Sequence, residues 1–291
     1  MPTSTPTKWW SKDTVAVITG ANQGIGYEIA RQLAQNGLTV VATARSEERG
    51  KAAVEALRKE LGGEAQELVA FHLLDVTSDE SVAALAQWLR QTYRGVDILV
   101  NNAGIARAET EEKIFDTNYY GVKRVTKAIL PLLRPSPAGA RVINLTSDLG
   151  ILKSLSDKYC VEWKDRDQIT EDQIDHFIQQ YLGESKEGTS KSEEWEDVYK
   201  VYFLTKVALN AYTSVLAREV GPAKEKVYVN CFNPGLTRTN MNDYLSTLQG
   251  NTFQINTLQE AAMTGIWLAL HPVGGPHGKY LEQKNGSIAE W

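Results

Sequence analysis

The chain reads Thr19-Gly-Ala-Asn-Gln-Gly-Ile-Gly26 directly after its first apolar run and directly before a helix-period segment. A glycine-rich turn in this context binds a dinucleotide pyrophosphate, because the helix N-terminus offers N–H groups and a partial positive charge. Gly20 would permit the tight bend, Gly24 would let the pyrophosphate approach the backbone, and Gly26 would let helix and strand pack closely. The stretch therefore predicts a dinucleotide site, with a simple helix-start turn as the alternative.

Short β-branched runs alternate with helix-period segments from Thr14 onward, which predicts βαβ units and a parallel sheet. The runs are nearly continuous in apolar residues, as expected of strands buried on both faces. We expect an α/β fold with a Rossmann-type doubly wound parallel sheet of about seven strands, in a single domain at 14–291 after a lead-in at 1–13. The expected strands are 14–19, 38–43, 67–74, 96–101, 140–146, 226–232 and 278–282, and the expected helices are 24–36, 47–61, 78–93, 110–133, 198–220 and 258–270.

The segment 148–197 interrupts this alternation, because it is polar, with one helical patch at 170–182 and an acid-rich tail. A structureless loop of that length is unusual in a compact domain, so we expect a helical cap. It lies between two elements that carry chemistry, which makes it a candidate lid. A solvated insertion with no role in binding is the alternative.

Charge and cysteine usage exclude several classes of function. The 31 Lys and Arg against 36 Asp and Glu give a net charge of −5, so no basic surface favours nucleic acid or an anionic membrane. The two cysteines, Cys160 and Cys231, cannot build a disulfide framework, which favours a reducing, cytoplasmic compartment. The histidines lack metal-ligand spacing, and the apolar stretches are too short to span a bilayer. We therefore expect a small-molecule partner, with no metal, nucleic acid or membrane.

The end of the second expected strand bears on which nicotinamide cofactor binds. An acidic residue there would bind the adenosine ribose 2′-hydroxyl and repel a 2′-phosphate. This chain has Ala44 and Arg45 instead. Arg45 and Arg49, with Asn22 nearby in the glycine turn, are suited to hold the 2′-phosphate through charge-assisted hydrogen bonds, so we predict NADPH over NADH. The alternative is that both arginines are solvated surface.

A tyrosine and a lysine stand four residues apart in the helix expected at 198–220. Tyr202 and Lys206 would project from one face, so that the ammonium favours the phenolate. A free phenol titrates near pH ~10, and the lysine together with a positive nicotinamide ring would lower the pKa of Tyr202 toward a useful range. Chance also produces such pairs, and Tyr199 is a rival tyrosine, but no lysine follows it four residues later.

Three further polar features accompany this pair. Asn101-Asn-Ala-Gly104 ends the fourth expected strand, where small residues permit close approach of backbone to a cofactor. Asn118 lies inside a helical segment, where asparagine is disfavoured and so requires a reason, with a kink bound to backbone as the alternative. Ser147 follows the fifth expected strand.

In this order, the motifs resemble those of the short-chain dehydrogenase/reductase superfamily, and the resemblance runs from about Thr14 to Trp291. Finer features are the stretch Ala42-Thr-Ala-Arg-Ser-Glu-Glu-Arg-Gly50, the insertion before Tyr202 and the ending Gly275-Pro-His-Gly-Lys-Tyr280. These are similar to the monomeric carbonyl reductases, a branch that includes the mammalian enzyme and the plant menthone, neomenthol and salutaridine reductases.

The resemblance implies a role for each of these residues. Tyr202 would protonate the carbonyl oxygen, Ser147 would hold that oxygen, and Lys206 would bind the nicotinamide ribose while tuning Tyr202. Asn118 would anchor a water molecule that passes protons to Lys206. The implied cofactor contacts are Gly20, Asn22, Gln23, Gly24, Ile25, Gly26, Arg45, Arg49, Asp75, Val76, Asn102, Ala103, Gly104, Tyr202, Lys206, Asn233, Pro234, Gly235 and Thr237.

The resemblance also implies a monomer, because the insertion would cover a face through which tetrameric relatives contact partner subunits. The substrate pocket is expected between the insertion and the segment after Pro234. Its candidate contacts, for each of which ordinary packing is an equal alternative, are Leu149, Trp195, Tyr199, Leu236 and Met241.

Three functions are compatible with the sequence, and an NADPH-dependent reductase of ketones or aldehydes is favoured. A reductase of conjugated C=C bonds is disfavoured, because the relatives of that kind replace the tyrosine that Tyr202 provides. An NADP(H)-binding regulator with little turnover is disfavoured by the intact set of Asn118, Ser147, Tyr202 and Lys206.

Overall fold

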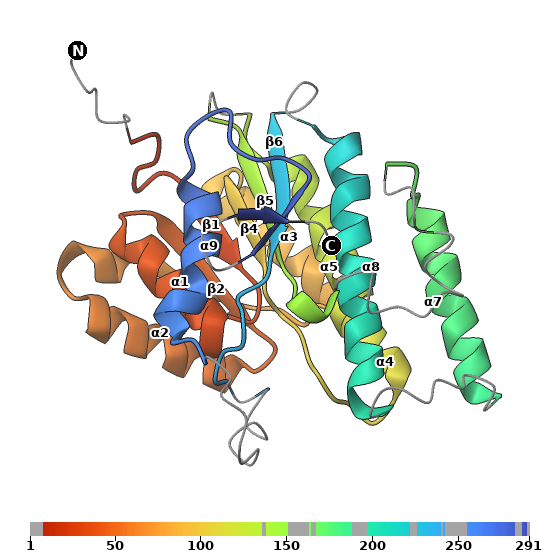
Figure 1. Cartoon of the computed structure of the whole chain (residues 1–291). Coiled ribbons are helices and arrows are strands. Elements are labelled where there is room, and N and C mark those ends of the chain that lie inside the picture. The colour runs from red at the N-terminus through yellow and green to blue at the C-terminus, as the bar shows by residue number, and fades with distance from the viewer. Residues whose placement is uncertain are drawn as a thin grey trace.

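The computed structural model describes residues 8–135, 138–150, 163, 167–187, 197–221, 226–239, 241, 255–282 and 287–289. Its strands form one sheet in the order β3-β2-β1-β4-β5-β6-β7-β8, in which β1 to β7 run parallel and β8 pairs antiparallel with β7 (Figure 1). The order reverses between β1 and β4, which is where this kind of sheet binds its ligand. The strands are β1 Val15–Ile18, β2 Thr39–Ala44, β3 Val69–Leu73, β4 Ile98–Asn101, β5 Ala140–Leu145, β6 Val227–Phe232, β7 Lys279–Glu282 and β8 Ser287–Ala289.

Helices cover both faces of the sheet, with α1, α2 and α9 on one side and α3, α4, α5 and α8 on the other (Figure 1). Alternate residues of β1 enter two separate apolar cores, Val15 and Val17 on one face and Ala16 and Ile18 on the other. The expected doubly wound α/β sheet is confirmed. The helices are α1 Gly24–Gln35, α2 Glu47–Leu61, α3 Asp79–Tyr93, α4 Glu111–Phe115, α5 Gly121–Ile129, α7 Glu171–Lys186, α8 Asp197–Glu219 and α9 Leu258–Leu270.

The helix starts have identifiable local causes. Ser46 accepts a hydrogen bond from the backbone N–H of Arg49 and so caps α2, and Ser78 caps α3 in the same way. Thr257 and Glu260 form a capping box at the start of α9. Side-chain caps of this kind fix where a helix begins, and the expected starts of these helices match to within one residue.

Two features differ from the sequence expectation. The single helix expected at 110–133 is divided by a π-helical turn, Asp116–Tyr120, into α4 and α5, and it ends in a 3₁₀ turn at Leu130–Leu132, where Pro131 cannot donate a backbone N–H. The short strand β8 was not expected. It covers the edge of β7, which would otherwise be the last strand of the sheet.

Within the insertion 148–197, α7 occupies the place where a helical patch was expected. It begins at a capping box formed by Thr170 and Gln173, and it buries an apolar stripe that joins the core beside α8. Lys123 of α5 is buried and reaches Glu171 at 2.9 Å and Asp175 at 2.7 Å. The acid-rich tail at 184–197 lies mostly outside the described residues. No helix in the described part of the chain is long and apolar enough to cross a membrane.

Candidate active site

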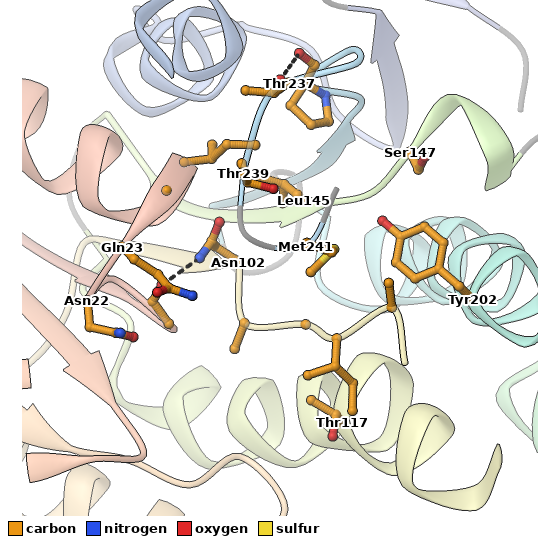
Figure 2. Close-up of a pocket in the computed structure, with 18 of the residues that line it drawn as sticks. Asn22, Gln23, Asn102, Thr117, Leu145, Ser147, Tyr202, Thr237, Thr239 and Met241 are labelled. Atoms are coloured by element: carbon orange, nitrogen blue, oxygen red, sulfur yellow. Dashed lines mark hydrogen bonds between the residues drawn. The ribbon is translucent and has the colours of Figure 1, made fainter. Parts of the chain in front are cut away.

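A cavity of about 640 Å³ opens at the carboxyl ends of the parallel strands, where residues following β1 to β6 converge. This volume is in the usual range for a small-molecule or cofactor site. Every predicted cofactor contact lines it except Gly26. Figure 2 shows Asn22 and Gln23 on one side of the cavity and Ser147 and Tyr202 on the other.

The glycine turn is shaped by close contacts with the end of β4. Gly20 has φ of +65°, and a Cβ there would lie 2.9 Å from Cα of Ala103. At Gly26, a Cβ would lie 2.3 Å from Nδ2 of Asn102, which donates hydrogen bonds to the carbonyls of Thr19 and Gly20 at 2.8 and 3.0 Å. Gly26 thus lies behind the turn and makes room for Asn102, and it does not face the cavity.

The N-terminus of α1 differs from those of α2, α3 and α9. It has no side-chain cap and no acidic residue in its first turn, and its first residues, Gly24 and Ile25, line the cavity. A helix start without an acidic cap favours an anionic ligand. The observation fits the pyrophosphate of a dinucleotide.

The part of the cavity wall that follows β2 and β3 carries Arg45, Arg49 and Asp75. Both arginines are exposed. The Asp75 carboxylate accepts hydrogen bonds from the backbone N–H and the hydroxyl of Thr77 at 2.9 and 2.7 Å. Burial raises the pKa of Asp75, but these hydrogen bonds and the charges of Arg45 and Arg124 together hold it below its ordinary value. Arg45 therefore lies close enough to interact with Asp75 across this end of the cavity.

Helix α8 brings Tyr202 and Lys206 to the other end. The Lys206 ammonium lies 5.4 Å from the centroid of the Tyr202 ring and donates a hydrogen bond to the carbonyl of Leu145 at 2.9 Å. Burial lowers the pKa of Lys206 to about 8, so the side chain is still mostly a cation at neutral pH. A fixed positive charge beside a phenol is the arrangement that stabilises a phenolate.

Ser147 stands two residues after the end of β5, on the same side of the cavity as Tyr202 (Figure 2). Its Oγ donates a hydrogen bond to Oδ1 of Asp148 at 3.1 Å, and its carbonyl accepts one from the buried hydroxyl of Tyr280 at 3.4 Å. Tyr280 on β7 therefore fixes the backbone at Ser147. Asp148, which also lines the cavity, was not among the predicted site residues.

Asn118 lies in the π-helical turn and is buried, but it does not line the cavity. Its Oδ1 accepts from the N–H of Ile105 and its Nδ2 donates to the carbonyl of Ile105, both at 2.8 Å. Nδ2 also reaches Thr205 Oγ1 at 3.1 Å, and Thr205 donates to the carbonyl of Tyr202 at 2.6 Å. Asn118 therefore ties the loop after β4 to helix α8. These contacts agree with the kinked-helix alternative, and the water relay to Lys206 stays a prediction.

Comparison with known proteins gives a consistent result. The family model for short chain dehydrogenases matches residues 14–157. The chain is 36% identical to (+)-neomenthol dehydrogenase of Arabidopsis thaliana, over 94% of this chain and 97% of that protein. The chain belongs to the short-chain dehydrogenase/reductase family. It is also 33% identical to carbonyl reductase (NADPH) 1 of Bos taurus, over 97% of this chain and 99% of that protein. The solved structure of salutaridine reductase from Papaver somniferum has a TM-score of 0.80 at 33% identity, over 92% of this chain and 99% of that chain.

The candidate substrate contacts of this short-chain dehydrogenase/reductase are only partly described. Leu236 and Met241 line the cavity. Trp195 and the side chains of Leu149 and Tyr199 lie outside the described residues. Further lining residues, which sequence reasoning did not find, come from the loop after β4, from α4 and the π-helical turn, from the segment after β6 and from the start of α9: Ile105, Ala106, Lys113, Thr117, Arg238, Thr239 and Leu258.

Proposed function

We propose that the protein is an NADPH-dependent carbonyl reductase, which reduces a ketone or aldehyde to an alcohol in a reversible reaction. The observation that carries the proposal is that Ser147, Tyr202 and Lys206 line one end of the cavity whose other end holds the glycine turn and two arginines. The relatives named as a neomenthol dehydrogenase and a carbonyl reductase (NADPH) support this reading.

The cavity wall supplies the groups that an NADPH molecule requires. When bound, NADPH supplies the hydride. The start of α1 would hold the pyrophosphate, and Arg45, Arg49 and Asn22 would hold the 2′-phosphate. Asp75 and Val76 would frame the adenine, Asn102 to Gly104 would face the ribose and the nicotinamide, and Asn233, Pro234, Gly235 and Thr237 would face the nicotinamide carboxamide.

The chain's own contribution to the reaction is positioning and proton supply. Ser147 holds the carbonyl oxygen, and the hydroxyl of Tyr202 gives that oxygen its proton. The Lys206 ammonium then stabilises the negative charge that stays on the Tyr202 oxygen. Asn118 positions helix α8 through its hydrogen bond to Thr205. A water molecule near Asn118 would pass a proton to Lys206.

A panel of carbonyl compounds tests the proposal. Purified protein is mixed with NADPH and cyclic monoterpene ketones, aromatic aldehydes, quinones or α,β-unsaturated ketones, and NADPH consumption is followed while products are identified by mass spectrometry. We expect alcohols. Saturated ketones as products would favour C=C reduction, and measurable NADPH binding without turnover would favour a regulator.

We further propose that the chain is a monomeric, cytoplasmic protein with one domain at 14–291. Helix α7 packs beside α8, and the ion pair between the buried Lys123 and the partly exposed Asp175 holds it on α5, so α7 already covers this face of the molecule. Strand β8 covers the edge of β7. The expected result is a single species near 32.3 kDa in size-exclusion chromatography with light scattering. A dimer or tetramer at micromolar concentration would contradict it.

A further inference from the structure

The cavity wall next to Ser147 carries a carboxylate that the proposed reaction does not use. Asp148 begins the short 3₁₀ turn Asp148–Gly150, directly after Ser147, and its side chain is exposed and lines the cavity. Its Oδ1 accepts the hydrogen bond from Ser147 Oγ at 3.1 Å. To hold the carbonyl oxygen of a substrate, Ser147 turns its single O–H from Asp148 to that oxygen, and the carboxylate of the adjacent residue stays near the reacting group. Figure 2 shows Ser147 and Tyr202 on the side of the cavity opposite Asn22 and Gln23 of the glycine turn.

The negative charge of Asp148 is not neutralised by the described part of the chain. Among those residues, no lysine or arginine forms an ion pair with it, and Ser147 is its hydrogen-bond partner. The nearby cation, Lys206, is buried and directs its ammonium to the carbonyl of Leu145. Of the other charged residues that line the cavity, Arg45, Arg49 and Asp75 follow β2 and β3, Lys113 is paired with Glu109, and Arg238, in the segment after β6, is exposed.

We propose that Asp148 is a specificity-determining residue, which favours ketones that carry a protonated amine a short distance beyond the carbonyl and disfavours ketones that carry a carboxylate there. Opposite charges at near contact attract and like charges repel, and partial enclosure by the cavity strengthens both effects relative to open water. Because the Asp148 side chain is exposed, the effect is that of a partly screened ion pair. The inference rests on the proposed function, since it requires Ser147 to bind the carbonyl oxygen.

Three aryl ketones of similar size test this inference. β-Dimethylaminopropiophenone is cationic at neutral pH, isoamyl phenyl ketone is its neutral isostere, and β-benzoylpropionate is anionic. The measured quantity is the ratio of kcat/KM for each charged ketone to that for the neutral one. The wild-type protein is expected to prefer the cationic ketone and to discriminate against the anionic one.

The variant Asp148→Asn removes the charge but keeps an oxygen that can accept the hydrogen bond from Ser147. We expect the cationic-to-neutral ratio to fall roughly two- to fivefold and the anionic-to-neutral ratio to rise. If the substitution also disturbs Ser147, kcat/KM falls by the same factor for all three ketones. Such a general loss of activity cancels in the ratios. The matched control is Asp13→Asn, which removes an exposed charge before β1, at the opposite edge of the sheet, and should leave both ratios as in the wild type.

Two results would overturn the inference, namely a wild-type protein without preference for the cationic ketone, or ratios that Asp148→Asn leaves unchanged. The preference should also weaken as salt is added, because salt screens exposed charges.

Dissociation constants of the three ketones, measured by calorimetry on the full chain saturated with NADP⁺, give a second readout. If no ketone is reduced, the carbonyl reductase proposal fails, whereas the dissociation constants still decide whether Asp148 selects for charge.

Discussion

Replacing Tyr202 by phenylalanine is expected to lower kcat for ketone reduction by about 10²–10⁴-fold, while the dissociation constant for NADPH stays close to that of the wild type. The change removes one oxygen atom and leaves the ring on α8. The Lys206 ammonium keeps its position, because its hydrogen bond goes to the carbonyl of Leu145. Only the proton donor is lost. Steady-state kinetics with excess ketone give kcat, and the quenching of protein fluorescence by NADPH gives the dissociation constant.

Tyr212→Phe is the matched control for this variant. Tyr212 lies on the same helix, is buried, and does not line the cavity. Its loss of a hydroxyl should therefore change stability more than kcat. A Tyr202→Phe protein with wild-type turnover would show that another group protonates the carbonyl oxygen, and it would remove Tyr202 from the proposed mechanism.

Most of the helices and strands could be predicted from the sequence, because local features such as caps and apolar periodicity determine them. Helix α9 was expected at 258–270 and is found there, since Thr257 and Glu260 cap it and an apolar period runs through it. The division of the segment at 110–133 has a different cause. Hydrogen bonds that join Asn118 to Ile105 and to Thr205 hold the π-helical turn, and Thr205 lies 87 residues farther along the chain. The periodic pattern of apolar residues within one segment cannot predict such a tertiary contact.

The same distinction applies to the candidate site. Residues at the carboxyl ends of parallel strands meet at one edge of the sheet, so motifs such as Asn101-Asn-Ala-Gly104 and Ser147 could be placed together from their order alone. Lys113 of α4 and Thr117 of the π-helical turn also line the cavity, although neither belongs to a motif at the end of a strand. Asp148 is visible beside Ser147 in the sequence. Whether its carboxylate faces the cavity depends on the 3₁₀ turn at Asp148–Gly150, which no local motif predicts.

Replacing both Arg45 and Arg49 by glutamine is expected to raise the KM for NADPH by about 10- to 100-fold and to change the KM for NADH far less. A hydrogen bond to a charged group contributes about 1.5–3 kcal/mol, and NADH lacks the 2′-phosphate that would receive these bonds. Both side chains line the cavity where β2 ends, and the charge of Arg45 acts on Asp75 across the same wall. Steady-state kinetics with each cofactor, at saturating ketone and fixed salt, give the two KM values.

Lys51→Gln separates this specific effect from the general loss of positive charge. Lys51 lies on α2 with Arg49, is 62% exposed, pairs with Glu47 at 2.7 Å, and does not line the cavity. If long-range attraction of an anionic cofactor were the cause, Lys51→Gln would raise both KM values in part, and added salt would reduce the difference between variant and wild type. If the arginines bind the 2′-phosphate directly, the control keeps wild-type KM values and the double variant loses its preference for NADPH. Equal increases for NADPH and NADH would mean that the two arginines are solvated surface, because only a contact with the 2′-phosphate distinguishes the two cofactors.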